Sequence, residues 1–225
     1  MKILVLSCDK SVDLFDPFHH CIEKYWPEHP EIIYSTESVG NPYYKTICIN
    51  YDLKHWSLRV KECLELLNDE YVLIMVDDIF LRHKVDNDYF NYIVNSIPSN
   101  AANINLELSF DKKDIPYNDD LKKRWEKGKY KTSVMCGVWN REKAIQCFDV
   151  VADPWEIEQI NDRFNFTYYV LNNKQALDWG HTPDKIIWGV YQGKWTQEAL
   201  DFLQSEGFNI INDRVINTSV RGVFK

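Results

Sequence analysis

An α/β fold with a mostly parallel central sheet flanked by helices is predicted by the first 80 residues. Three apolar runs, at 2–7 (KILVLS), 31–35 (EIIYS) and 70–76 (EYVLIMV), are typical of buried strands. Segments whose apolar residues recur at helical spacing separate them, at about 15–26 and 51–68. Strands that alternate with helices are typical of βαβ units, whose strands pair in parallel.

The remaining elements follow from capping residues and breakers. Asp86 can accept hydrogen bonds from the first turn of a helix that ends before Pro98, and Asp153-Pro154 is a typical start of another helix. The other predicted elements are strands at 102–108 and 133–139, a polar loop with one short helix at 111–131, helices at 141–150 and 196–204, and a strand-like tail.

Length, charge and cysteine spacing limit the function. The 225 residues fit one α/β domain, or one domain with a small attached subdomain. A net charge of -8 argues against a nucleic-acid-binding protein, which needs a basic surface. The one basic cluster has two readings: a solvated surface, or a surface that contacts an anionic acceptor or a membrane. Its members are Lys122, Lys123, Arg124, Lys127, Lys129 and Lys131.

The sequence indicates a cytoplasmic protein, held at the inner membrane face if the basic cluster contacts lipid. The opening MKILVLSCDK lacks the apolar length of a signal peptide, and no run approaches the ~18 apolar residues of a transmembrane span. The six cysteines show no C-x-x-C spacing, so we expect reduced thiols rather than a structural zinc site.

Two adjacent carboxylates, Asp77 and Asp78, follow the most apolar run. Neighbours in a strand point to opposite faces, so both cannot be buried without a partner. A divalent cation such as Mn²⁺ or Mg²⁺ accepts one or two carboxylates and leaves positions for substrate phosphate. The alternative is a turn in which the pair caps backbone amides.

Parallel strands bring their carboxyl ends to one edge of the sheet, where ligands bind. Ser7 and Asp9, after the first strand, are therefore expected near the acidic pair. The helix before the pair carries Ser57 and Arg59, and a guanidinium can hold phosphate oxygens. The alternative for Arg59 is a surface salt bridge.

The stretch at 51–81, YDLKHWSLRVKECLELLNDEYVLIMVDDIFL, resembles the nucleotide-sugar half of GT-A glycosyltransferases. In that fold an arginine-bearing helix precedes the strand that ends in an Asp-x-Asp metal motif, here Asp-Asp. Three later stretches resemble bacterial glycosyltransferases of surface-polysaccharide (capsule or lipopolysaccharide) clusters: GVWNRE (137–142), DPWEIE (153–158) and YQGKW (191–195).

The resemblance implies a nucleotide-sugar-binding half at 1–110 and an acceptor-binding half with the C-terminal segment at 111–225. It also implies a UDP-linked donor and assigns roles to single residues. Ser7, Cys8 and Asp9 would contact the nucleoside, Ser57, Arg59 and Lys194 the phosphates, and Asp77, Asp78 and His181 the metal. The alternatives are an ordinary loop residue for His181 and a turn residue for Lys194.

A general base near the acceptor is the remaining expectation from the resemblance. Glu158 and Glu156 are the candidates, although Glu156 also fits a capping box with Asp153. A base would take the proton of the acceptor hydroxyl as it attacks the anomeric carbon, with inversion. Retention stays open, because spacing does not place Glu158 near the acceptor.

The predicted function is metal-assisted transfer of a sugar from a nucleotide sugar to a glycan or lipid-linked acceptor. Two other classes remain open. A divalent-metal phosphohydrolase also uses paired aspartates at a strand end, but it normally needs further ligands such as a histidine cluster. A non-catalytic carbohydrate-binding protein would use the eight tryptophans but leaves the acidic pair unexplained.

Overall fold

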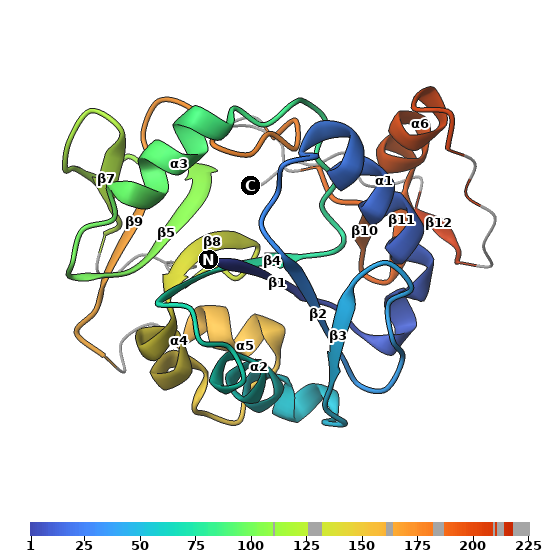
Figure 1. The fold of residues 1–225 in the computed structure, drawn as a ribbon, viewed down its shortest axis with the longest axis horizontal. Coiled ribbons are helices and arrows are strands. Elements are labelled where there is room, and N and C mark those ends of the chain that lie inside the picture. Colours follow the sequence, from blue (N-terminus) through green and yellow to red (C-terminus); the bar gives the residue numbers. More distant parts are fainter. Residues whose placement is uncertain are drawn as a thin grey trace.

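The computed structural model describes residues 1–109, 111–125, 132–160, 164–181, 187–208, 210 and 214–217. The strands of its central sheet are β1 (Lys2–Leu6), β2 (Ile32–Thr36), β3 (Lys45–Cys48), β4 (Tyr71–Val76), β5 (Ala101–Leu108), β6 (Ile115–Pro116), β7 (Leu121–Lys123), β8 (Cys136–Asn140) and β9 (Thr167–Leu171). In space their order is β3-β2-β1-β4-β8-β5-β9-β7-β6 (Figure 1).

The predicted fold class is confirmed. β3, β2, β1 and β4 pair in parallel, and β5 pairs in parallel with β9. β8 lies between β4 and β5 and is antiparallel to both, and β7 is antiparallel to its neighbours β9 and β6. Both halves of the chain therefore contribute strands to one mostly parallel sheet.

Helices cover both faces of this sheet (Figure 1). One face carries α2 (Trp56–Glu65), α4 (Arg141–Phe148) and α5 (Pro154–Gln159), and the other carries α1 (Phe15–Tyr25), α3 (Asn87–Asn95) and α6 (Gln197–Ser205).

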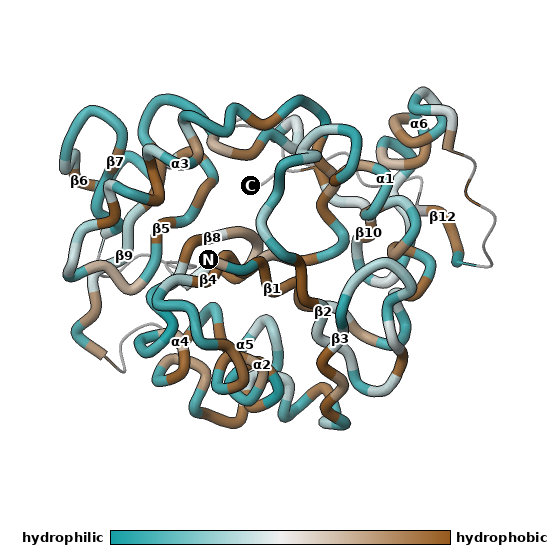
Figure 2. Tube along the Cα trace, viewed as in Figure 1, coloured by the Kyte–Doolittle hydropathy of each residue, from teal (hydrophilic) through white to brown (hydrophobic). Residues whose placement is uncertain are grey.

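The two covering layers explain the continuous apolar runs of the sequence. In β1, Ile3 and Val5 belong to the core on the α1 side, whereas Leu4 and Leu6 belong to the core on the α2 side. A strand that is buried on both faces needs an apolar residue at every position. The central strands are accordingly hydrophobic along their length (Figure 2).

A second, three-stranded sheet lies beside α1 and α6. It consists of β10 (Val190–Tyr191), β11 (Lys194–Thr196) and β12 (Ile216–Asn217), in the order β10-β11-β12. Trp195 of β11 is fully buried, and its ring lies 6.0 Å from that of Phe80, just after β4. The small sheet is thereby attached close to the carboxyl end of β4.

Some sequence predictions are wrong. The segment predicted as a polar loop contains the antiparallel pair β6–β7 and, in its described part 111–125, no helix; residues 126–131 lie outside the described residues. The predicted 51–68 helix is shorter, because a 3-10 turn at Leu53–His55 precedes α2. Sequence analysis missed β3 and β9.

None of the helices in the described ranges combines the length and the apolar content that crossing a bilayer requires.

Two helices start at the predicted capping residues. The Asp86 carboxylate accepts a hydrogen bond from the N–H of Tyr89, and Asp153 and Glu156 form a complete capping box at α5.

Leu73→Ala is expected to lower the free energy of unfolding by about 2–5 kcal/mol, because the fully buried side chain in β4 would leave a cavity. Leu66→Ala is the matched control: this side chain is 64% exposed, so we expect a change within about 0.5 kcal/mol. Equilibrium unfolding in urea measures both. Similar losses in the two variants would contradict the burial of β4.

Candidate functional site

The acidic pair ends β4 at the carboxyl edge of the parallel strands. In the β1–β4 register Leu6 lies opposite Val76, so the next residues, Ser7 and Asp77, also meet. The Ser7 hydroxyl donates to Asp77 Oδ2 over 2.5 Å, and both residues are buried. The predicted convergence of Ser7 with the acidic pair is thus a consequence of strand register.

Burial dominates the electrostatics of the pair. It raises the pKa of Asp77 to about 8; the Ser7 hydrogen bond opposes this increase, and the neighbouring charge of Asp78 adds to it. Burial also raises the pKa of Asp78 to about 7, and the positive charge of Arg214 opposes the increase. For both carboxyls, burial thus outweighs the hydrogen bonds and charges that favour the ionised form.

Asp78 differs from Asp77 in its surroundings. Asp78 is half-buried as a residue, and among the described residues no other residue donates a hydrogen bond to its carboxylate. Its backbone carbonyl accepts from the Gly189 N–H over 2.6 Å. The position is therefore fixed through the backbone, while no other described residue fixes the carboxylate.

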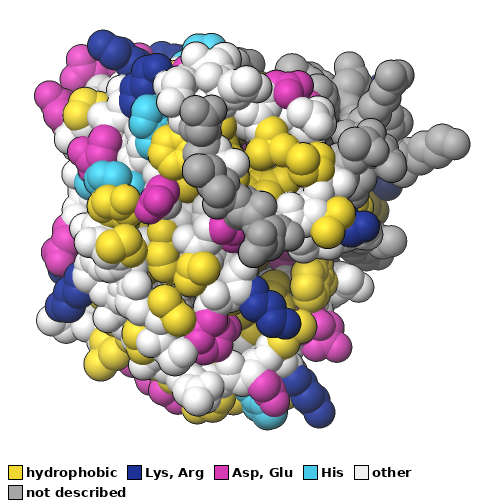
Figure 3. Space-filling model, turned by 90° about the vertical axis from the view of Figure 1, so that its right-hand side faces the viewer, with side chains coloured by type: hydrophobic (Ala, Val, Ile, Leu, Met, Phe, Trp, Pro, Cys, Tyr) yellow, Lys and Arg dark blue, Asp and Glu magenta, His cyan; other side chains and the backbone are white. Residues whose placement is uncertain are grey.

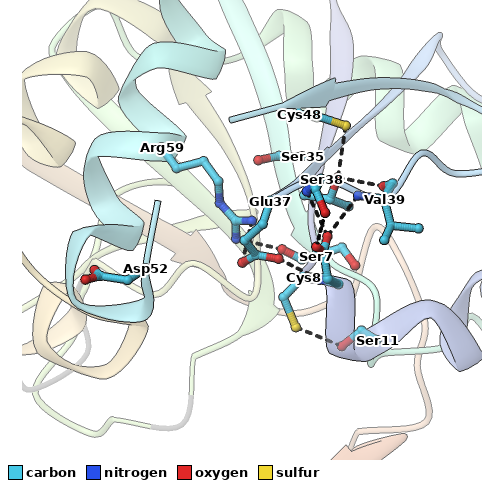
Figure 4. Close-up of polar contacts among 12 residues, drawn as sticks. Ser7, Cys8, Ser11, Ser35, Glu37, Ser38, Val39, Cys48, Asp52 and Arg59 are labelled. Atoms are coloured by element: carbon cyan, nitrogen blue, oxygen red, sulfur yellow. Dashed lines mark hydrogen bonds and ion pairs between the residues drawn. The ribbon is translucent and has the colours of Figure 1, made fainter. Parts of the chain in front are cut away.

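Arg59 lies in α2 but points into the interior, toward the ends of β1 and β2. The side chain is 1% exposed; Nη2 donates to the Ser7 carbonyl over 2.7 Å, and Nη1 lies 2.7 Å from Glu37 Oε1. Figure 4 shows Glu37 between Arg59 and the loop after β1. Arg59 therefore forms its ion pair in the interior rather than at the surface. In this arrangement its guanidinium is not exposed to a phosphate.

Asp9 fixes the loop after β2. Its carboxylate accepts from the Ser38 N–H and hydroxyl and from the Val39 N–H, over 2.5–3.0 Å. Burial acts to raise the pKa of Asp9, but these hydrogen bonds outweigh it and lower the pKa to about 2. The preceding Cys8 is half-buried, with Sγ 3.3 Å from Ser11 Oγ.

Ser57 lies away from these groups. It is fully buried, its hydroxyl donates to the Val150 carbonyl, and it accepts from the Ala152 N–H over 3.1 Å. These bonds attach α2 to the segment between α4 and α5. The structure thus gives Ser57 a packing contact and does not bring it to the acidic pair.

The two predicted base candidates have different surroundings. Glu156 is exposed and accepts from the Asp153 N–H over 3.1 Å in the capping box. Glu158 accepts from the Val134 N–H over 3.0 Å, and burial is the main cause that raises its pKa. Met135, which follows Val134, accepts from the Val76 N–H with its carbonyl. Through this segment Glu158 is anchored near the end of β4 that carries Asp77.

His181 and Lys194, the remaining predicted ligands, lie in different environments. The His181 ring is buried; Nδ1 lies 3.2 Å from Glu107 Oε1 and Nε2 lies 3.2 Å from the Ile187 carbonyl. Lys194 is exposed on β11. Over the described ranges, no three His, Cys, Asp or Glu side chains group as a metal site, so His181 does not complete a three-ligand set with the aspartates.

Sequence analysis missed four polar residues of this edge: Glu37, Glu107, Asp13 and Arg214. Arg214 donates to the Asp13 carboxylate from Nε over 2.8 Å, and Trp195 Nε1 donates to the same carboxylate over 3.0 Å. Glu37 follows β2 as the acidic pair follows β4, and that position was a usable signal. Nothing in the sequence pairs Arg214 with Asp13, 201 residues away.

No protein-family model and no curated protein sequence matches this chain. Among solved structures it is similar to the bifunctional IspDF of Campylobacter jejuni, with TM-score 0.47 and 13% identity over 80% of this chain and 51% of that one. It is also similar to the galactosyltransferase LgtC, with TM-score 0.41 and 10% identity over 74% of this chain and 67% of that one. A third similar structure is the glycosyltransferase GlyE of Streptococcus pneumoniae, with TM-score 0.45 and 7% identity over 72% of this chain and 44% of that one. Likenesses of this size do not identify an activity.

Gly189→Ala is expected to destabilise the protein by about 1–3 kcal/mol, because its Cβ would lie 2.5 Å from Phe80 and 2.8 Å from the Asp78 carbonyl. Gly40→Ala is the matched control, since nothing lies within 4 Å of a Cβ there; we expect a change within about 1 kcal/mol. Urea unfolding measures both. Equal stability of the two variants would contradict the close approach of Gly189 to Asp78.

Proposed function

We propose that this protein is a glycosyltransferase that binds a nucleotide-sugar donor at the carboxyl edge of β1, β2 and β4. The observation that carries the proposal is the acidic pair after β4, in which Ser7 fixes Asp77 while no other described residue holds the Asp78 carboxylate. Two carboxylates in this state suit a cation that is shared with a diphosphate. The Asp-Asp motif after an arginine-bearing helix also resembles the donor site of GT-A glycosyltransferases, which supports the proposal.

Asp77 and Asp78 fit Mn²⁺ or Mg²⁺ by chemistry. Both ions prefer oxygen ligands, and burial has already weakened the solvation of both carboxylates. A bound ion would supply positive charge to the oxygens of the leaving diphosphate. The carboxylates of Asp77 and Asp78 would hold it, without His181.

Glu158 is the proposed general base. One of its oxygens is held by the Val134 N–H, which orients the carboxylate, and its raised pKa makes it a better proton acceptor than an exposed glutamate. It would take the proton of an acceptor hydroxyl during a single displacement, which inverts the anomeric centre. Glu156 stays the runner-up but is engaged at the start of α5.

The finer features of the proposal are a UDP-linked donor, a glycan or lipid-linked acceptor and a role in surface-polysaccharide synthesis. Lys122, Lys123 and Arg124 lie in and directly after β7, on the β9 side of the sheet. They would contact an anionic acceptor or the inner face of a membrane. Lys127, Lys129 and Lys131 of the same cluster lie outside the described residues.

Metal-dependent nucleotide binding is the first test. We expect one nucleoside diphosphate or nucleotide sugar to stabilise the wild type only with Mn²⁺, by roughly 2.7 kcal/mol at 100 times its dissociation constant. Asp78→Asn should abolish this gain in thermal melting, because the amide weakens the cation site. Asp88→Asn, an exposed position in α3, should keep it.

A wild type that no nucleotide stabilises, with or without metal, would refute the donor site. Phosphate release from a model phosphate ester would favour the hydrolase class instead. Glycan binding that needs neither metal nor nucleotide would favour a carbohydrate-binding protein.

Glu158→Gln is expected to lower kcat by about 10²–10⁴-fold without changing donor affinity, because it removes the base but keeps the shape. Glu156→Gln is the matched control and should keep kcat within a few-fold. Nucleoside diphosphate release from the stabilising donor, with a panel of sugar acceptors, measures both. A larger loss of kcat in Glu156→Gln than in Glu158→Gln would indicate that Glu156, and not Glu158, is the general base.

A further inference from the structure

An ion pair between a buried arginine and a half-buried glutamate joins the ends of two neighbouring parallel strands. Arg59 contacts the Ser7 carbonyl after β1 with Nη2 and the Glu37 carboxylate after β2 with Nη1, both over 2.7 Å (Figure 4). Its side chain is 1% exposed and that of Glu37 is 25% exposed. A charge in such a position is costly unless its partners are fixed, so the pair constrains both loops.

The constraint extends beyond the ion pair. Glu37 Oε2 accepts from the Asp9 N–H over 2.6 Å, and the Asp9 carboxylate in turn binds the backbone of Ser38 and Val39. The loops after β1 and β2 therefore hold each other through Glu37 and Asp9. Arg59 is the group that anchors this arrangement to α2.

One residue connects the arrangement to the acidic pair. Ser7 accepts from Arg59 with its carbonyl and donates to Asp77 with its hydroxyl. A shift of the Ser7 peptide would move the hydroxyl and hence the orientation of the Asp77 carboxylate. Only a guanidinium offers two separate N–H groups in a rigid plane, so lysine preserves the charge but not the geometry.

We infer that Arg59 is a positioning residue: it fixes the Ser7–Asp9 loop and, through Ser7, the orientation of Asp77. This differs from the direct phosphate contact that the sequence suggested. The effect on donor binding rests on the proposed function, whereas the effect on the loop does not.

Cys8 reports on the loop without any ligand. Apart from Cys8 and the exposed Cys48, the cysteines are buried, so in a Cys48→Ser background a maleimide labels Cys8 first. Arg59→Lys should raise the labelling rate at fixed pH about tenfold, the change that corresponds to ~1.4 kcal/mol of lost loop order. Arg141→Lys is the matched control: its Nε donates to the Asp69 carbonyl, next to the other end of β4, and it should leave the rate unchanged.

An unchanged rate in a folded Arg59→Lys variant would overturn the inference, and so would an equal rise in Arg141→Lys. Glu37→Asp tests the same pair from its other side: it keeps the negative charge that helps to raise the pKa of Cys8 but shortens the reach to Arg59. It should also raise the rate, which keeps the test decisive if Arg59→Lys does not fold. Thermal melting verifies that each variant is folded.

A double-mutant cycle tests the route through Ser7. With UDP and Mn²⁺ as probes, Arg59→Lys and Ser7→Ala should each weaken nucleotide binding about tenfold. The double variant should lose no more affinity than the single variant with the larger loss. Losses that multiply would show that Arg59 acts on the nucleotide by a separate route. A wild type that does not bind UDP with Mn²⁺ would refute UDP as the probe ligand, while Cys8 labelling would still decide the role of Arg59.

Discussion

The hydrogen bond from Ser7 to Asp77 joins the ends of the two central parallel strands, and the polar groups of the site are arranged around it. It exists because β1 and β4 pair in register up to Leu6 and Val76. A carboxylate buried at this place needs a donor, and a serine at the matching position provides one. The carbonyl of the same serine accepts a hydrogen bond from Arg59, so a single residue links the sheet register, the acidic pair and helix α2.

The sequence predicts the parts of the fold in which every residue is constrained by burial. The runs that became β1, β2 and β4 are covered on both faces, so their apolar pattern is unambiguous. β3 is an edge strand with exposed and half-buried residues, and it has no comparable pattern. The β6–β7 pair is missed for the same reason: its residues are mostly exposed or half-buried, and β7 is held by pairing with β9, which is distant in sequence.

The site is predictable only in part, for a related reason. The place of Asp77 and Asp78 follows from the strand they end, because chain order fixes it. Whether Arg59 faces solvent or the interior depends on how α2 packs on the sheet and on Glu37, which follows another strand. The pairing of His181 with Glu107, 74 residues earlier, likewise arises from tertiary packing that no local pattern encodes.

The polar groups of this edge divide by how fully the protein already uses them. Arg59 is paired with Glu37 and donates to the Ser7 carbonyl, although its buried Nε and Nη1 have no hydrogen-bond acceptor among the described residues. The Asp9 carboxylate is bound by the loop after β2, and Ser57 is engaged in packing. Asp78 is not held through its side chain by another described residue, whereas Glu158 is oriented by the Val134 N–H and the Ser133 side chain. A group whose bonds are already satisfied must break them to bind substrate, and that costs free energy. Asp78 avoids this cost, and this is why we propose the cation there, the base at the oriented carboxylate of Glu158 and the positioning at Arg59.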